Sequence, residues 1–202
     1  MKKPITHRIP LILASTSEGR QAQLRKAGLT FTCQSPKVDE DTLKAEIAHL
    51  PVDEQALRLG RFKGQAVSED NPESLVISGD QICVQGDEIL HKPLTNERVA
   101  QQLMHMSGKT HQLYTSGCVF KAGHVVWEGV AVTSLHMREL SQQEVDRYTL
   151  YEDARFCCTA YKIEGLGLHF VERIDGDGQS IMGLPLLGLL NALHAHNFIR
   201  IG

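Results

Sequence analysis

A hydroxyl-rich turn near the start of the chain has the composition of an anion-binding site. The apolar residues 9–14 lead into Ser15-Thr16-Ser17, and a polar, helix-like stretch that includes Arg20 follows. Backbone N–H groups at a helix start attract anions, and a guanidinium offers a planar fork of donors suited to phosphate. The alternative is a serine that only caps a helix, beside a solvated arginine.

Two acidic residues could bind a metal or activate a water molecule. Asp80 follows an apolar, strand-like run in Ser78-Gly79-Asp80-Gln81, where open sheets commonly place ligand-binding groups. Its carboxylate could hold Mg²⁺ or accept a proton from water, or it could simply cap a turn. Glu40 lies in the segment Asp39-Glu40-Asp41, which we interpret as an acidic loop.

Two lysines complete a set that could cleave a triphosphate. Lys63 lies in a helix-like segment and Lys92 in His91-Lys92-Pro93, although each would be an ordinary solvated lysine if considered alone. Cleavage between the α and β phosphates needs a water nucleophile, a metal and cations that stabilise the developing charge. Glu40 and Asp80 could bind the metal and orient the water, while the basic side chains hold phosphates.

The bulk composition is that of a folded enzyme-sized domain. With 202 residues, 42% of them hydrophobic, the chain is expected to form one domain over residues 1–202, with room for two lobes around a cleft. The net charge of −3 argues against a nucleic-acid binder. Five cysteines without a CxxC pair or zinc-site spacing indicate reduced thiols in the cytoplasm. A signal peptide or a membrane span is not expected, since no apolar run is long enough.

The pattern of apolar residues predicts mixed secondary structure. Strands are expected at residues 9–14, 30–34, 75–85, 111–138 (a hairpin turning at 122–124) and 166–174, and helices at 18–27, 52–68, 95–106, 141–151 and 185–196. The fourth helix opens with a capping box, Ser141-Gln142-Gln143-Glu144. Because strands and helices do not alternate strictly, we expect an α/β or α+β fold with a mixed, twisted sheet and a cleft.

The order of these segments resembles the Maf family. The resemblance runs from about residue 10 to 190 and is carried by residues 13–20, 38–40, 59–66, 77–81, 90–94, 106–111, 164–167, 170–174 and 183–186. It implies an elongated mixed sheet with flanking helices and a deep cleft, similar to the inosine-triphosphate pyrophosphatases. It also implies hydrolysis of a nucleoside triphosphate to the monophosphate and pyrophosphate with Mg²⁺ or Mn²⁺, and a homodimer.

The resemblance assigns roles to single residues. Asp80 corresponds to the family's proton acceptor, and Glu40, Lys63 and Lys92 to residues that handle metal, water and phosphate. Glu40 and Asp80 are the expected metal ligands. The expected phosphate-binding residues are Ser15, Thr16, Ser17 and Arg20.

Three positions separate the family's branches by substrate, and here they hold Gly19, Gln81 and Glu164. Gln81 and Glu164 resemble the 7-methyl-GTP branch, as does Cys83, whereas the dTTP/UTP branch tends to have threonine and glutamine in place of Gln81 and Glu164. A carboxylate at position 164 could accept the N1–H and N2–H₂ donors of 7-methylguanine and oppose its positive charge. The sequence therefore predicts 7-methyl-GTP as substrate, with dTTP or UTP as the alternative.

The sequence also departs from the family's pattern. Glu18-Gly19-Arg20-Gln21 stands where the family usually has a proline, a variable residue and two arginines, His91 replaces a glycine, and Cys158-Thr159-Ala160-Tyr161 replaces a small-residue stretch. These departures bear on the substrate and the rate more than on the fold. Two other hypotheses also stay open. One is a nucleotide-binding regulator of cell division with little turnover, and the other is a generic phosphatase that releases inorganic phosphate.

Overall fold

The computed structural model describes residues 5–202, which form two compact units. Unit 1 contains residues 5–80, 115–131 and 182–202, and unit 2 contains residues 81–114 and 132–181. The long strands β7 (Thr110–Lys121) and β8 (His124–Met137) contribute residues to both units and are joined by the predicted turn. The described residues form six α-helices and a mixed sheet, so the expected mixed α/β class is confirmed.

The sheet of unit 1 places two strand ends beside each other. Strand β2 (Leu11–Leu13) is parallel to both β3 (Thr32–Cys33) and β4 (Leu75–Ser78), and β4 is antiparallel to β7. Every residue of β2 and β4 is buried, as in strands that are covered on both faces. Because β2 and β4 are parallel neighbours, their carboxyl ends lie at the same edge of the sheet.

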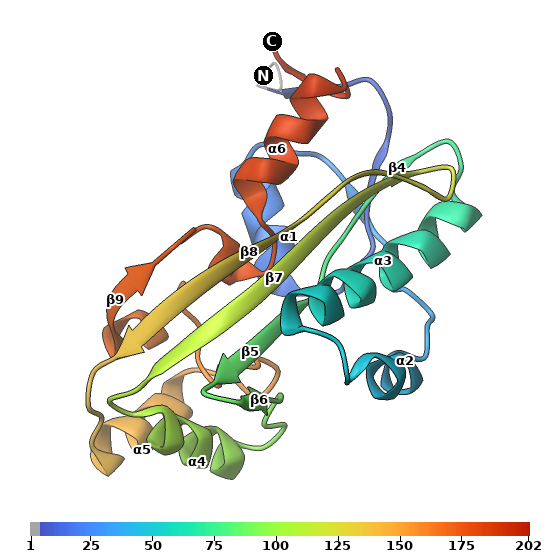
Figure 1. Cartoon of the computed structure of the whole chain (residues 1–202). Helices are drawn as coiled ribbons and strands as arrows, with labels where there is room; N and C mark the ends of the chain where they lie inside the picture. Colours follow the sequence, from blue (N-terminus) through green and yellow to red (C-terminus); the bar gives the residue numbers. More distant parts are fainter. Residues whose placement is uncertain (1–4) are drawn as a thin grey trace. The chain divides into compact units, whose positions relative to one another are not determined.

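Unit 1 contains four helices: α1 (Glu18–Lys26), α2 (Glu40–Ile47), α3 (Val52–Asp70) and α6 (Leu186–Ala195). Leu24 of α1 and Leu189 of α6 belong to one apolar cluster with Leu13 and Ile77, whereas α3 packs in a second cluster through Val67. Figure 1 shows α3 running along β4. The two clusters therefore cover opposite sets of strand side chains, as the alternation of side chains along a strand requires.

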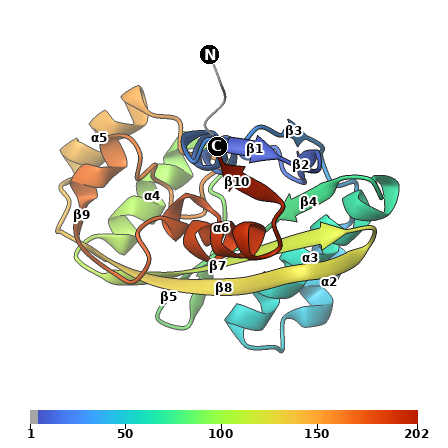
Figure 2. The same ribbon diagram turned by 90° about the horizontal axis from the view of Figure 1, so that it is seen from above.

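The two ends of the described chain pair with each other. Strand β1 (Ile5–His7) is antiparallel to β10 (Ile199–Ile201), and the two lie side by side in Figure 2. Neither strand was predicted from the sequence, because three-residue strands carry too little periodicity to be recognised.

Helix α3 approaches the sheet closely because it has glycine on its inner face. A Cβ atom on Gly64 would meet the Ser78 hydroxyl and would lie 2.6 Å from Cδ2 of Phe120. A Cβ on Gly60 would lie 2.7 Å from the Ser116 hydroxyl and 3.3 Å from the Gly79 Cα atom. The two glycines therefore let the backbone of α3 lie directly against the side chains of the sheet.

We expect Gly64→Ala to lower the free energy of unfolding by about 2 kcal/mol, because overpacking outweighs the higher helix propensity of alanine. Chemical denaturation measures the change. Gly178→Ala is the matched control, since its added Cβ would have no neighbour within 4 Å. A Gly64→Ala protein as stable as the control would mean that the helix can move away from the sheet at little cost.

Unit 2 has its own core. It contains β5 (Gln81–Gln85), β6 (Glu88–Leu90), α4 (Asn96–Met106), α5 (Gln142–Tyr151) and β9 (Val171–Asp175). Strands β5 and β6 form an antiparallel hairpin whose turn uses Gly86 at φ 60°, and α4 and α5 pack side by side (Figure 1).

In the core of unit 2 the buried His111 bonds through Nε2 to the Tyr161 hydroxyl at 2.9 Å, and burial lowers the pKa of His111 to about 4.

Several predicted elements are confirmed, and three need correction. The helices at 52–68, 95–106, 141–151 and 185–196 and the hairpin at 111–138 are confirmed, including the capping box. The acidic loop at residues 39–41 was wrong, because Asp39 caps α2 and Glu40 is its first residue. The strand at 75–85 is interrupted at Gly79-Asp80, and the strand at 166–174 begins as a 3₁₀ helix, Leu166–Phe170, before β9.

The cysteines form no disulfide bonds. All five cysteines are free, with Cys83 and Cys118 buried and Cys33 exposed. Within residues 5–202 no helix is both long and apolar enough to cross a membrane.

Candidate active site

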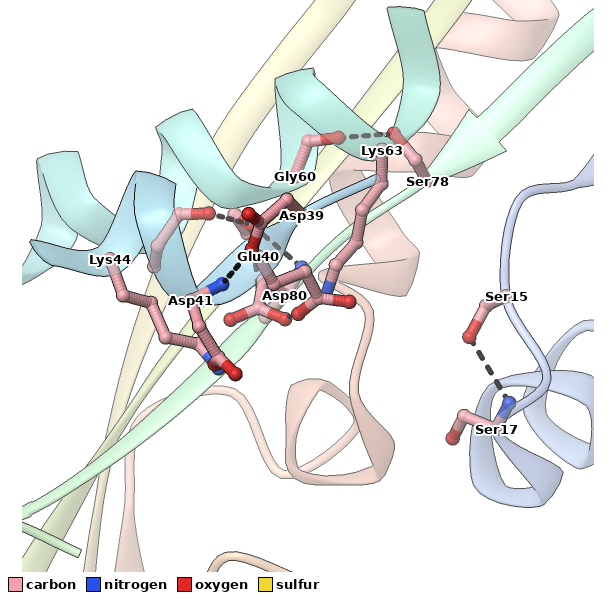
Figure 3. A network of polar contacts seen from close by, with 12 residues as sticks. Ser15, Ser17, Asp39, Glu40, Asp41, Lys44, Gly60, Lys63, Ser78 and Asp80 are labelled. Carbon is pink, nitrogen blue, oxygen red and sulfur yellow. Dashed lines mark hydrogen bonds and ion pairs between the residues drawn. The ribbon is translucent and has the colours of Figure 1, made fainter. Parts of the chain in front are cut away.

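Three charged side chains of unit 1 meet at the end of β4. The Lys63 Nζ atom lies 2.6 Å from an Asp80 carboxylate oxygen and 2.8 Å from a Glu40 carboxylate oxygen. Figure 3 shows Lys63 reaching from α3 toward both acids. Its side chain is 9% exposed, compared with 15% for Asp80 and 35% for Glu40. We call these three residues the charged cluster; it carries a net charge of −1.

Each member of the charged cluster comes from a different element. Asp80 is the second residue after β4, Lys63 lies in the middle of α3, and Glu40 is the first residue of α2. Asp39 starts α2 by accepting hydrogen bonds from the backbone N–H groups of Asp41 and Thr42. The Thr42 hydroxyl also donates to this carboxylate, and it lowers the pKa of Asp39 together with the backbone bonds. Helix α2 packs against α3, so this cap also determines where Glu40 lies relative to Lys63.

The predicted phosphate turn also belongs to unit 1. Ser15 follows β2 as Asp80 follows the neighbouring β4, and Ala14 donates its backbone N–H to the Ile77 carbonyl at 2.8 Å. The two segments therefore leave the same edge of the sheet. Ser17 is the N-cap of α1, and its hydroxyl accepts the Arg20 backbone N–H. Ser17 therefore caps α1 and Thr16 is exposed, while phosphate binding by Ser15, Thr16 and Ser17 stays a prediction.

Arg20 is held in place rather than solvated. Its Nε donates to the Gly183 carbonyl at 2.9 Å, and its Nη1 donates to the Ser15 hydroxyl at 3.2 Å. Gly183 has φ 110°, and a Cβ there would lie 3.1 Å from the Arg20 side chain. Gly19 is equally confined, since its Cβ would lie 3.1 Å from the Met182 carbonyl oxygen. The glycine at position 19 therefore lets α1 lie close to the Met182–Gly183 backbone.

The remaining predicted site residues belong to unit 2. Lys92 and His91 are exposed in the segment between β6 and α4, and they line a hollow of about 360 Å³ together with residues of α4 such as Arg98. Glu164 is exposed just before the 3₁₀ helix. Gln81, in contrast, donates its side-chain amide to the Ile181 carbonyl at 3.0 Å and so supports the backbone of its own unit.

The charged cluster has the chemistry to bind a hard cation. Two carboxylates from separate elements already converge on one positive charge, and each carries a second oxygen. Mg²⁺ prefers oxygen ligands and is often held by one or two carboxylates plus substrate phosphates. No group of three or more histidine, cysteine or acidic residues among residues 5–202 is arranged to hold a metal. The two carboxylates of Glu40 and Asp80 fit a cation that also binds substrate phosphates.

Sequence comparison identifies the family. The family model described as Maf-like protein matches residues 10–196. A protein of Rhodospirillum rubrum named nucleoside triphosphate pyrophosphatase is 38% identical over 194 residues, which cover 94% of this chain and 96% of the relative. A protein of Brucella abortus named 7-methyl-GTP pyrophosphatase is 37% identical over 195 residues, covering 95% and 98%. A Bradyrhizobium diazoefficiens relative, 36% identical over 95% of this chain and 96% of its own, carries the general name.

The chain belongs to the Maf family, and the relatives named above are nucleoside triphosphate pyrophosphatases, which are hydrolases. The resemblance seen in the sequence is therefore confirmed. The roles of the individual residues stay predictions. For five of them the contacts within unit 1 are described above: Asp80, Lys63, Glu40, Arg20 and Ser15.

Proposed function

We propose that this chain hydrolyses a nucleoside triphosphate to the monophosphate and pyrophosphate, and that 7-methyl-GTP is its preferred substrate. The observation that supports the reaction most strongly is the charged cluster, in which Asp80 and Glu40 share the Lys63 ammonium. A half-buried aspartate beside a lysine at the end of a strand is suited to proton transfer in a phosphate site.

In the proposed reaction, Asp80 accepts a proton from the water that attacks the α-phosphorus. The bond between this phosphorus and the bridging oxygen breaks, and pyrophosphate leaves. Lys63 keeps the Asp80 carboxylate oriented, and Arg20, together with the first N–H groups of α1, attracts the negatively charged phosphates. Glu40 and Asp80 would hold a Mg²⁺ or Mn²⁺ ion, which supplies charge neutralisation of the phosphate oxygens when bound.

The preference for 7-methyl-GTP has two supports. Relatives from two Brucella species with 37% identity carry that name, and this chain has a carboxylate at position 164. The Glu164 side chain is exposed and could accept the donors of a 7-methylguanine edge. Gln81 would act indirectly, since its amide group bonds to backbone carbonyls. The same proposal has two further parts. Lys92 binds a phosphate of the substrate, and the protein forms a homodimer.

A nucleotide panel tests the proposal. Purified protein is incubated with 7-methyl-GTP, GTP, dTTP and UTP in Mg²⁺ or Mn²⁺, and both pyrophosphate and inorganic phosphate are measured. We expect pyrophosphate as the product and the highest kcat/KM for 7-methyl-GTP. Faster turnover of dTTP or UTP would refute the substrate, and inorganic phosphate as the primary product would indicate a generic phosphatase. Tight nucleotide binding without either product would indicate a regulator.

We expect Glu164→Gln to lower kcat/KM for 7-methyl-GTP by about 10–100-fold relative to its effect on UTP, because the amide carries no charge to oppose that of the methylated base. Steady-state kinetics with both nucleotides measure the ratio. Glu172→Gln, at another exposed glutamate of unit 2, is the control and should leave the ratio unchanged. An equal loss for both nucleotides would remove Glu164 from base recognition.

A further inference from the structure

Ser116 is a buried polar residue that directly contacts the backbone of Asp80. It lies in β7 with 0% exposure. Its hydroxyl accepts the Asp80 backbone N–H at 2.9 Å, and its own backbone N–H donates to the Asp80 carbonyl at 2.8 Å. Both backbone polar groups of Asp80 are therefore bonded to this one serine.

The same hydroxyl also joins Asp80 to helix α3. It donates to the Ala56 carbonyl at 2.6 Å. Ala56, Gly60 and Lys63 are spaced i, i+4 and i+7, so they lie on one face of α3. Because Gly60 has no side chain, this face is close enough for the Ser116 hydroxyl to reach the helix backbone.

A second serine binds α3 in the same way but not Asp80. The Ser78 hydroxyl donates to the Gly60 carbonyl at 2.8 Å, one helical turn further along α3, and Ser78 is also 0% exposed (Figure 3). The two serines thus make the same kind of bond to the same helix. They differ in that the Ser116 hydroxyl additionally holds the Asp80 backbone.

We propose that Ser116 is a positioning residue for catalysis: its hydroxyl holds the Asp80 backbone at a constant position relative to α3, and thereby keeps the Asp80 carboxylate against the Lys63 ammonium. This inference rests on the proposed function, in which Asp80 accepts the proton. The contact to be preserved is the 2.6 Å distance between Lys63 Nζ and the Asp80 oxygen. A misplacement of about 1 Å can cost about 10²-fold in rate.

The proposal predicts a selective loss of kcat. Ser116→Ala removes the acceptor of the Asp80 N–H and the donor to Ala56, so we expect kcat for pyrophosphate release to fall by about 10–100-fold with KM changed less than about threefold. Ser78→Ala loses one comparable bond to α3 and should reduce stability similarly, while its kcat stays within about twofold. Ser116→Cys, which keeps a weak hydrogen-bonding group of similar shape, should retain an intermediate kcat.

A double-mutant cycle with Lys63 separates positioning from a general loss of stability. If Ser116 acts by keeping Asp80 against Lys63, then Ser116→Ala should cost kcat little more in a Lys63→Met protein. Equal kcat losses in Ser116→Ala and Ser78→Ala, a rise in KM alone, or fully additive effects in the cycle would overturn the inference while leaving the proposed function intact. A wild-type protein that releases no pyrophosphate would overturn the proposed function itself, and this inference with it.

Discussion

Replacing Asp80 by asparagine is expected to reduce kcat for pyrophosphate release by about 10³-fold, within the range usual for losing a general base. Asparagine has nearly the same shape and can still accept a hydrogen bond from Lys63, but it does not take a proton from water at neutral pH. Because the proton transfer is needed in the chemical step, the loss should appear mainly in kcat, with a smaller rise in KM for the nucleotide from the lost metal ligand. Steady-state kinetics with the best nucleotide of the panel measure both.

The control for this prediction is a second aspartate that also faces a lysine. Asp41 lies 3.4 Å from Lys44 in α2, and its side chain is 95% exposed. Asp41→Asn should keep full activity. The thermal unfolding of both variants checks that each is folded. A folded Asp80→Asn protein with more than about one tenth of the wild-type kcat would exclude Asp80 as the general base.

The sequence indicates the identity of the site residues better than their arrangement. Asp80 and Ser15 could be recognised because each comes at the end of an apolar strand. The two strands are parallel neighbours, so both residues lie at the same edge of the sheet. The meeting of Lys63 with Glu40 could not be predicted, because it depends on how α2 packs against α3. Helix α2 itself was missed, since its eight residues contain only Leu43 and Ile47 as large apolar positions.

Ser116 shows why some positioning groups leave no signal in a single sequence. A serine inside an apolar strand is compatible with many roles, and its two partners, Ala56 and Asp80, are 60 and 36 positions away. The only hint is a hydroxyl at a strand position whose neighbours are buried. Buried hydroxyls need a hydrogen-bond partner, so the fold, which shows the partners of Ser116, is needed to assign its role.

The charged cluster also makes a prediction about Lys63 itself. In the described part of the chain its ammonium is the group that offsets the charges of Glu40 and Asp80, so Lys63→Met leaves two facing carboxylates without a counter-ion. We expect kcat/KM to fall by about 10²–10³-fold, because a positive charge near the phosphates and the orientation of Asp80 are lost together. The free energy of unfolding at pH 7 should fall by about 2 kcal/mol, less than for a fully buried pair, since Glu40 reaches solvent.

Lys44→Met is the matched control for this substitution. Lys44 forms an exposed i,i+3 pair with Asp41, of a kind that contributes little to stability, so both activity and stability should stay near wild type. Kinetics and chemical denaturation of the two variants therefore show whether the effects of Lys63→Met depend on the position of Lys63 or follow from the loss of any lysine. Comparable activity in both variants would contradict a catalytic part for Lys63.

The Lys63→Met variant also tests whether Glu40 and Asp80 are metal ligands, with a measurement that does not depend on activity. Wild-type Lys63 competes for the oxygens of Glu40 and Asp80, whereas methionine leaves them free for a divalent ion. Because a ligand that binds only the folded state raises its stability, Mn²⁺ should raise the melting temperature of Lys63→Met by several degrees more than that of the wild type. Adding Glu40→Gln to Lys63→Met should abolish this increment. If Mn²⁺ stabilised the Lys63→Met and Lys63→Met/Glu40→Gln proteins equally, Glu40 would not be a ligand, and the part of this acid would be limited to its ion pair with Lys63.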